Sequence, residues 1–284
     1  MKKQIAAVLT LMLAGVVAGC GSSGTSSMMT PQGNSTASIS GKVADGYLVG
    51  ATVFLDKNGN YQMDSGEPSA TTDQNGAYVL NVNPADVGKY PIVAIATKGV
   101  TIDKDTGTAV LNSYILSMSA SATSGSVSSN FISPMSSQLR EMMETGNYAS
   151  MQQAMNDLGT KLGMPAGTNM LTDYMATNNA TMHTAAQNMA TLMGSQMPQV
   201  IGTNGSATTV DVNRYRGMMG TIFSNMSSVK GANAQANMSN LMGTMTANLN
   251  NIAPGQPFHN MSTAFRGGMM GGTGTSAMGG GMMR

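Results

Sequence analysis

The chain has 284 residues, a formal net charge of +1 and 10% charged residues, whereas soluble domains carry about 25%. This charge provides no basic field for nucleic acid, so we expect no nucleic-acid partner. One Cys excludes a disulfide framework and a Cys-ligated zinc site, and two His leave little material for a catalytic triad, so the composition predicts a protein that is not an enzyme.

The N-terminus has the features of an export signal. Lys2 and Lys3 precede an uncharged run over residues 5–18, which is shorter than the ~20 residues of a membrane span. The run ends in Val-Ala-Gly-Cys at Cys20, which resembles the lipobox of bacterial lipoproteins. The resemblance implies a signal peptide over residues 1–19, diacylglycerol on the Cys20 sulfur and an acyl chain such as palmitate on its amino group. Because Gly21 follows instead of Asp, it also implies an outer-membrane lipoprotein; the alternative is a plain secretory signal with an incidental Cys.

Residues 20–36 are small and polar and predict a flexible tether after the lipidated Cys. From residue 37 the pattern changes to short β-branched runs between Gly, Asp and Asn turns. Strands are predicted over residues 38–43, 50–55, 77–82 and 90–97, with 99–102 behind them. This spacing predicts an all-β sandwich over residues 37–115.

The segment between the second and third predicted strands has the composition of a calcium loop. Its oxygen-bearing side chains occupy positions 1, 3, 5, 9 and 12 of a twelve-residue stretch: Asp56, Asn58, Asn60, Asp64 and Glu67. Gln62, at position 7, would offer its backbone carbonyl, and calcium takes six to eight such oxygens. Position 6 is Tyr61, where an EF-hand loop has Gly, and no helices are expected on either side. The alternative is a polar hairpin loop that is merely solvated.

The string from Gly41 to Tyr78 resembles the calcium-binding Ig-like (prealbumin-like) repeats of bacterial surface proteins. It is similar to the B repeats of Gram-positive adhesins and to carboxypeptidase-regulatory-like modules, over roughly residues 38–110. The resemblance implies a calcium-stabilised sandwich that serves as a stalk or binding domain without catalysis. It assigns the calcium ligands to the loop residues above, with Asp73 either an extra ligand or a turn residue.

A linker is predicted over residues 116–132 and a small antiparallel helical bundle over 133–252. Ser133 and Pro134 form a typical helix start, and Gly146 fits a C-terminal cap. Apolar stripes at helical spacing run through residues 151–162, 182–197, 212–229 and 241–249. The predicted fold class is therefore α+β in separate domains, an N-terminal β-sandwich and a C-terminal bundle, with disordered termini.

Methionine is abundant, with 30 residues, 25 of them after residue 117. On the predicted helices we interpret them as core residues in place of Leu, and His183 as a surface or partly buried helix residue. The Gly/Met-rich tail over residues 253–284 is instead predicted to be disordered and exposed. Its candidate residues for soft-metal binding, Cu(I) above all, or for oxidation are His259, Met261, Met269, Met270, Met278, Met282 and Met283.

Together these features predict a non-enzymatic lipoprotein of the outer membrane with a calcium-stabilised Ig-like module. It would act in surface structure, adhesion or envelope interaction, through its lipid anchor and a protein or glycan partner that the sequence does not identify. One alternative is a methionine-rich periplasmic Cu(I)-binding protein or oxidant sink. Another, ranked last, is a hydrolase that uses acids from the helical region: Glu141, Glu144, Asp157, Asp173 or Asp211.

Overall fold

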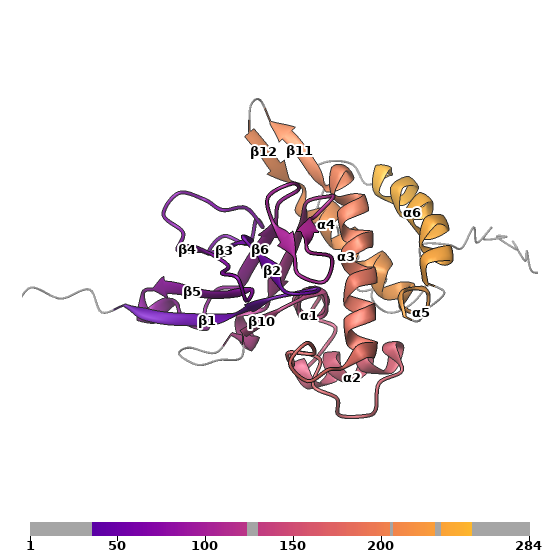
Figure 1. Ribbon diagram of the computed structural model, residues 1–284, viewed down its shortest axis with the longest axis horizontal. Coiled ribbons are helices and arrows are strands. Elements are labelled where there is room, and N and C mark those ends of the chain that lie inside the picture. The colour runs from indigo at the N-terminus through magenta and orange to yellow at the C-terminus, as the bar shows by residue number, and fades with distance from the viewer. Residues whose placement is uncertain (1–35, 124–129, 205–206, 231–233, 252–284) are drawn as a thin grey trace, which may run out of the picture. The chain divides into compact units, whose positions relative to one another are not determined.

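The computed structural model describes residues 36–123, 130–204, 207–230 and 234–251, which form six α-helices and several small sheets (Figure 1). Mixed α and β content is therefore confirmed. The signal peptide, Cys20, the tether before residue 36 and the candidate tail residues 259–283 lie outside the described residues.

The larger sheet has the strand order β4-β3-β6-β9, with every neighbouring pair antiparallel. Its strands are β3 (Thr52–Leu55), β4 (Ser69–Thr71), β6 (Ile92–Ala96) and β9 (Tyr114–Met118). Every residue of β9 and four of the five residues of β6 are buried. These two strands are almost entirely apolar, with Ser117 of β9 the one polar residue, because both of their faces are covered.

The second sheet joins segments that are far apart in the sequence, in the order β10-β1-β5. Strand β1 (Ala37–Val43) pairs antiparallel with β5 (Ala77–Val82) and parallel with β10 (Asn130–Ile132). Strand β5 alternates buried and solvent-facing residues, so one face of this sheet packs on the core. Gly41 is required at the β1–β10 contact, since a Cβ there would lie 1.9 Å from the Asn130 carbonyl oxygen.

The remaining strands form one small sheet and one hairpin. The sheet β2-β7-β8 is formed by β2 (Leu48–Val49), β7 (Ile102–Asp103) and β8 (Thr108–Ala109). A hairpin of β11 (Ile201–Asn204) and β12 (Ala207–Val210) interrupts the helical region, where the sequence analysis predicted only helices. Short 3-10 turns cover Pro84–Asp86 and Ala120–Ala122.

Four of the described helices begin with a polar side-chain cap, and the sequence analysis predicted the first of these caps, Ser133. Ser133 caps α1 (Pro134–Glu144) through its contact with the Ser136 amide, Ser150 caps α2 (Met151–Leu162) and Asn179 caps α3 (Ala180–Val200). Asp211 caps α4 (Val212–Ser224), which is followed by α5 (Met226–Val229) and α6 (Ala234–Asn250). Each cap satisfies amides that lack a partner in the first helical turn.

The strands and helices share one core. A single cluster of buried apolar residues extends from Ile39 in β1 to Leu249 in α6. Helix α1 packs on β9 and β10, and α3 contacts β9, α4 and α6, which places α3 between the strands and α6 in Figure 1. The separate sandwich and bundle that the sequence predicts are therefore not confirmed. The predicted boundary at residue 115 falls inside β9, and β10 lies within the predicted linker.

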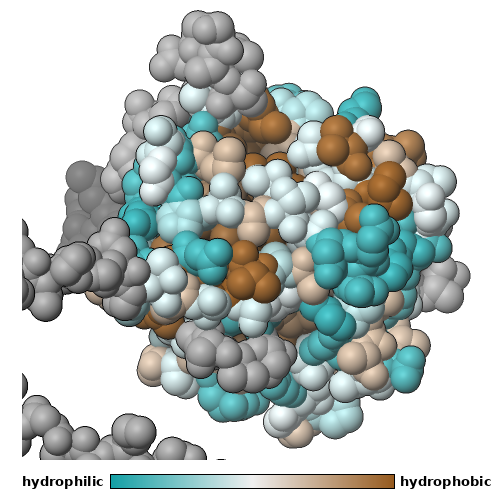
Figure 2. Space-filling model, turned by 60° about the vertical axis from the view of Figure 1, so that its left-hand side comes forward, coloured by the Kyte–Doolittle hydropathy of each residue, from teal (hydrophilic) through white to brown (hydrophobic). Residues whose placement is uncertain are grey.

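The surface carries few large apolar side chains. Among the described residues, those with high exposure are Met63, Val79, Val100 and Leu111. The face shown in Figure 2 has its hydrophobic residues in separate patches between hydrophilic ones. Across the described part of the chain, no helix is long and apolar enough to cross a membrane.

Candidate functional site

The loop over residues 56–67 leaves β3 at Leu55 and returns to the antiparallel strand β4. Its first residue, Asp56, is fully buried and accepts four hydrogen bonds. Oδ1 receives the Gly59 and Asn60 amides at 2.9 and 3.1 Å, and Oδ2 receives the Tyr61 amide at 3.3 Å and Arg140 Nη2 at 3.1 Å. Since a carboxylate accepts at about four lone-pair positions, Asp56 is saturated by the protein itself.

The other oxygen-bearing side chains of the loop gather near its exposed rim. The amide nitrogens of Asn58 and Asn60 both donate to Asp64 Oδ2, at 2.8 and 2.7 Å. Glu67 closes the loop, because its two oxygens accept the backbone amides of Lys57 and Asp64 at 2.7 and 3.0 Å. Two amide side chains therefore converge on one carboxylate oxygen of Asp64, and Glu67 is hydrogen-bonded to the backbone of the same loop.

The turn of this loop uses two residues in the left-handed region. Gly59 has φ of 75° and Tyr61 has φ of 61°, a conformation that glycine adopts readily and a bulky residue rarely does. The Tyr61 side chain is fully buried against the helices, which holds it in this conformation. The absence of flanking helices agrees with the sequence analysis, and together with the bend at Gly59 it distinguishes this loop from an EF-hand.

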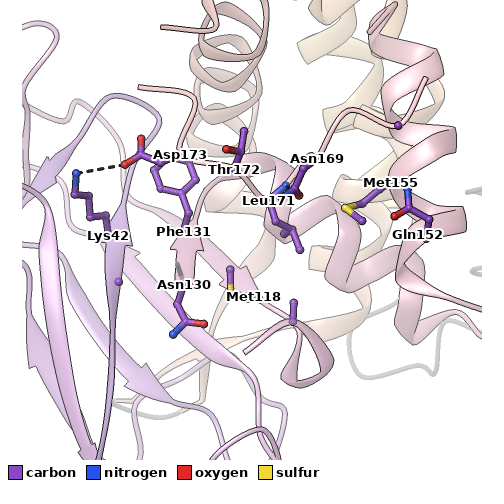
Figure 3. A pocket seen from close by; sticks show the side chains of 13 residues that line it. Lys42, Met118, Asn130, Phe131, Gln152, Met155, Asn169, Leu171, Thr172 and Asp173 are labelled. Atoms are coloured by element: carbon purple, nitrogen blue, oxygen red, sulfur yellow. Dashed lines mark hydrogen bonds and ion pairs between the residues drawn. The ribbon is translucent and has the colours of Figure 1, made fainter. Parts of the chain in front are cut away.

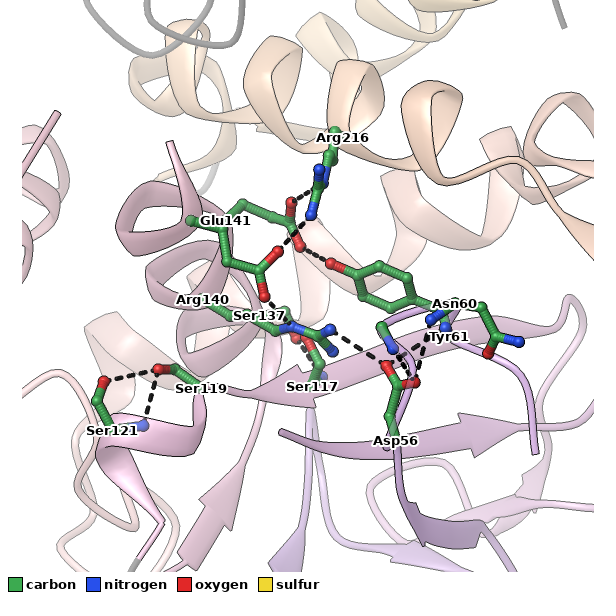
Figure 4. Close-up of polar contacts among 12 residues, drawn as sticks. Asp56, Asn60, Tyr61, Ser117, Ser119, Ser121, Ser137, Arg140, Glu141 and Arg216 are labelled. Atoms are coloured by element: carbon green, nitrogen blue, oxygen red, sulfur yellow. Dashed lines mark hydrogen bonds and ion pairs between the residues drawn. The ribbon is translucent and has the colours of Figure 1, made fainter. Parts of the chain in front are cut away.

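The residues of the predicted calcium site fit the ion only in part. Asn58, Asn60, Asp64 and Glu67 lie together, whereas Asp56 faces Arg140 (Figure 4). Gln62 contributes its backbone amide to Asn60 Oδ1 at 2.8 Å. Within the described residues, no group of three or more His, Cys, Asp or Glu side chains is arranged to hold a metal ion. Any calcium ligands in this loop would therefore be mainly Asp64, Glu67 and rotated Asn amides.

Asp73 lies outside this group. Its Oδ1 accepts the backbone amides of Asn75 and Ala77 at 2.7 and 2.9 Å, and these hydrogen bonds lower its pKa. The side chain therefore forms the turn before β5, which is the second of the two roles that the sequence left open for it.

A buried charged cluster connects the loop to the helices (Figure 4), and the sequence analysis did not identify it. Arg140 of α1 is 1% exposed, pairs with Asp56 and donates from Nε to Glu144 at 2.8 Å. Its guanidinium lies 4.1 Å from the centre of the Tyr61 ring. A guanidinium stacked on an aromatic ring and held by two carboxylates is well stabilised away from water.

Glu141, the next residue of α1, is fully buried and accepts a hydrogen bond from the Tyr61 hydroxyl. Arg216 of α4 lies 3.5 Å from Glu141 Oε2 and also pairs with Glu144. Burial raises the pKa of Glu141 to about 7, with a further increase from Glu144, while Arg140 acts in the opposite direction. The cluster therefore joins the loop, α1 and α4 in one ionic network.

The five acids considered for hydrolase chemistry each have a partner in the fold. Glu141 and Glu144 belong to the charged cluster, and Asp157 accepts from the Tyr148 hydroxyl at 2.6 Å. Asp173 pairs with Lys42 at 3.3 Å and accepts from Tyr47, and Asp211 caps α4.

The largest of the pockets described lies where β1 and β10 approach α2 and residues 167–173, with a volume of about 700 Å³ (Figure 3). Amide side chains line it alongside apolar ones: Asn130, Gln152 and Asn169 with Met118, Phe131, Met155 and Leu171. Its two charged residues, Lys42 and Asp173, form an ion pair with each other. The pocket thus offers no unpaired charge that would select a class of ligand.

The methionines of the described helices are mainly core residues, as the sequence predicts. The fully or almost fully buried ones on the long helices include Met135, Met142, Met182, Met189, Met193, Met218, Met219 and Met245. His183 is 27% exposed at its side chain and contacts Asp105 at 2.6 Å, which agrees with a partly buried helix residue.

Comparisons with known proteins identify no relative. No family model matches the chain, and neither a curated protein nor a solved structure is significantly similar to it.

Proposed function

We propose that this chain is a non-enzymatic, lipid-anchored envelope protein whose β3–β4 loop binds calcium weakly at its exposed rim. The observation that supports the calcium site is the convergence of Asn58 and Asn60 on Asp64 Oδ2, with Glu67 closing the loop. If both amides rotate by half a turn, their oxygens face a shared cation, and calcium binding must then compensate for two lost hydrogen bonds, those from the Asn60 amide to Asn58 Oδ1 and from the Gln62 amide to Asn60 Oδ1.

Asp56 has a different role in this proposal. It anchors the loop to Arg140 and to three loop amides, so the backbone is ordered before an ion arrives. Calcium then neutralises the rim without having to fold the loop. Two of the side-chain ligands are neutral amides, so we expect a dissociation constant in the range of about 10⁻⁴ to 10⁻³ M that extracellular modules have.

Calcium should raise the melting temperature of the metal-free protein, and EDTA should reverse the increase. At about 10 mM calcium and the dissociation constants above, mass action raises the free energy of unfolding by about 1.4 to 2.7 kcal/mol. The double variant Asp64→Asn, Glu67→Gln should lose the response, whereas the control Asp73→Asn should keep it. A wild-type melt that does not change with calcium would contradict the proposal.

The lipid anchor rests on the sequence around Cys20 and needs its own test. Labelling of producing cells with a radioactive fatty acid should mark the wild-type protein, and Cys20→Ser should abolish the label. Fractionation of the same cells tests the outer-membrane location. Unlabelled wild-type protein would favour the plain secretory signal.

The Cu(I) or oxidant-sink alternative depends on His259, Met261 and the tail methionines, which lie outside the described residues. It stays a prediction, and titration of Cu(I) into the chain with and without residues 253–284 tests it.

A further inference from the structure

A second pocket, of about 230 Å³, lies between helix α3 and the segment that runs from β7 to β9. Asp45 and Asp103 line it, together with Tyr114. Ala109, Val110 and Ala190 provide apolar surface, and hydroxyl and amide side chains line the pocket as well: Thr106, Thr108, Asn112 and Thr191. The pocket thus combines an acidic region with apolar and neutral polar surface.

Asp45 is a buried acid with a missing partner. The residue is only 8% exposed, and its Oδ2 accepts a hydrogen bond from the Tyr114 hydroxyl at 2.8 Å. Oδ1 is buried and has no hydrogen-bond partner among the described residues. Since nearly all buried polar atoms are hydrogen-bonded, an unpaired carboxylate oxygen on a residue that lines a pocket points to a donor that the described chain does not supply.

Further negative charge lies beside the next residue, Gly46. A Cβ on Gly46 would lie 2.5 Å from Asp105 Oδ2 and 2.6 Å from Asp103 Oδ1, so both carboxylates flank the residue next to Asp45. His183 and Gln187 of α3 contact Asp105, at 2.6 and 2.9 Å. Among the described residues, no lysine or arginine forms an ion pair with Asp45 or Asp103.

We propose that this pocket binds a small primary ammonium compound. The ammonium group donates to Asp45 Oδ1 and to the Asp103 carboxylate, and the attached short aliphatic chain packs against Ala109, Val110 and Ala190. An ammonium ion has three N–H donors, which suits an unpaired acceptor beside a second carboxylate. The apolar residues Ala109, Val110 and Ala190 suit the aliphatic chain of an organic cation, which a bare metal ion lacks.

Calorimetric titration of the purified full chain with n-butylammonium chloride tests the proposal. We expect saturable binding, and at least about tenfold weaker binding of tetramethylammonium, because it has no N–H group to donate. Asp45→Asn should weaken butylammonium binding by a similar factor while its amide oxygen still accepts the Tyr114 hydroxyl. Asp157→Asn, in α2 and not among the residues that line this pocket, removes the same charge and should leave the affinity unchanged.

Asp103→Asn changes a more exposed residue and should also weaken butylammonium binding. It provides the test if the Asp45→Asn variant does not fold. Equal affinity of wild type and both pocket variants, or equal affinity for the two ammonium ions, would overturn the proposal. So would the absence of saturable binding, which would leave a water molecule as the partner of Oδ1. Displacement of butylammonium by calcium in the Asp64→Asn variant would instead assign the pocket to a metal ion.

Discussion

The side chain of Arg140 lies between Asp56, Glu144 and the ring of Tyr61, almost completely removed from water. A charge in this position is tolerated because Nε and Nη2 each face a carboxylate and the guanidinium lies over the Tyr61 ring, although Nη1 has no hydrogen-bond partner among the described residues. Removal of the charge leaves the buried Asp56 carboxylate without its counter-ion, which is costly even though three backbone amides still contact it.

Arg140→Met should therefore lower the free energy of unfolding by about 3 to 5 kcal/mol. Chemical denaturation measures this change, with Lys98→Met at an exposed position as the control. The double variant Asp56→Asn, Arg140→Met should recover part of the loss, because the uncompensated charge is gone. A loss no larger than that of the control would show that the ion pair contributes little.

Glu141 makes stability depend on pH. Its pKa in the folded protein is raised from an ordinary 4.5 to about 7, first because the carboxyl is buried. The folded state therefore holds the proton more tightly than the unfolded state, so this stabilising contribution is present at low pH and is lost as pH rises from 4.5 to 7.

Glu141→Gln should abolish this dependence. Between pH 4.5 and 8, the stability of the variant relative to wild type should increase by about 3 kcal/mol. Denaturation series at several pH values test this, with Glu67→Gln as the control for loss of one negative charge. Parallel wild-type and variant curves would contradict the assigned burial.

At the scale of the elements, the parallel pairing of β1 with β10 depends on one small residue. Strand β10 begins at Asn130, 87 residues after β1 ends at Val43. Gly41 allows the two backbones to approach, because any Cβ there would overlap the Asn130 carbonyl. The strand, in turn, leads directly into the capped start of α1 at Ser133, so this pairing also positions the helix that carries Arg140 and Glu141.

Gly41→Ala should destabilise the protein by roughly 1 to 3 kcal/mol, since one strand must move to accommodate the methyl group. The matched control is Gly243→Ala, which lies in α6 with no atom near the added Cβ. It should stabilise the protein by about 0.5 to 1 kcal/mol through helix propensity. Thermal or chemical unfolding of both variants gives the comparison, and equal effects would argue against the β1–β10 contact.

At the scale of the whole molecule, the helices and strands depend on each other for burial. The core cluster is continuous from β1 to α6, and Tyr174 and Tyr215, from the helical part, donate hydrogen bonds to the Ala44 and Ile115 carbonyls. A fragment that ends at residue 115 would cut β9, omit β10 and expose the faces that α1 and α3 cover.

We therefore expect residues 37–115 to fail to fold alone, although the sequence analysis predicted an independent sandwich there. Circular dichroism and NMR dispersion of the isolated fragment test this against the full chain, which should unfold in one cooperative transition. A cooperative melt of the fragment would show that the two-domain prediction is right after all.

The sequence by itself determined the local features of this protein. Alternating or continuous apolar runs located β1, β3, β5 and β6, and Ser133 with Pro134 located the start of α1. The regular methionines predicted buried helix faces, and oxygen spacing identified the β3–β4 loop. These signals are readable because periodicity, capping and turn chemistry act between residues that are close in the chain.

Only the tertiary structure decided which distant residues meet. Asp56 has the spacing of a metal ligand, yet its partner is Arg140, 84 residues later. Asp45 reads as a turn residue, but folding buries it beside a pocket and leaves one oxygen unpaired. Strand β10 was likewise not predicted from the sequence, because its three residues are too few to show an alternation of buried and exposed side chains. Burial and ion pairing depend on how whole helices and strands pack together. The spacing of residues along the chain therefore does not show which distant side chain a given residue will contact.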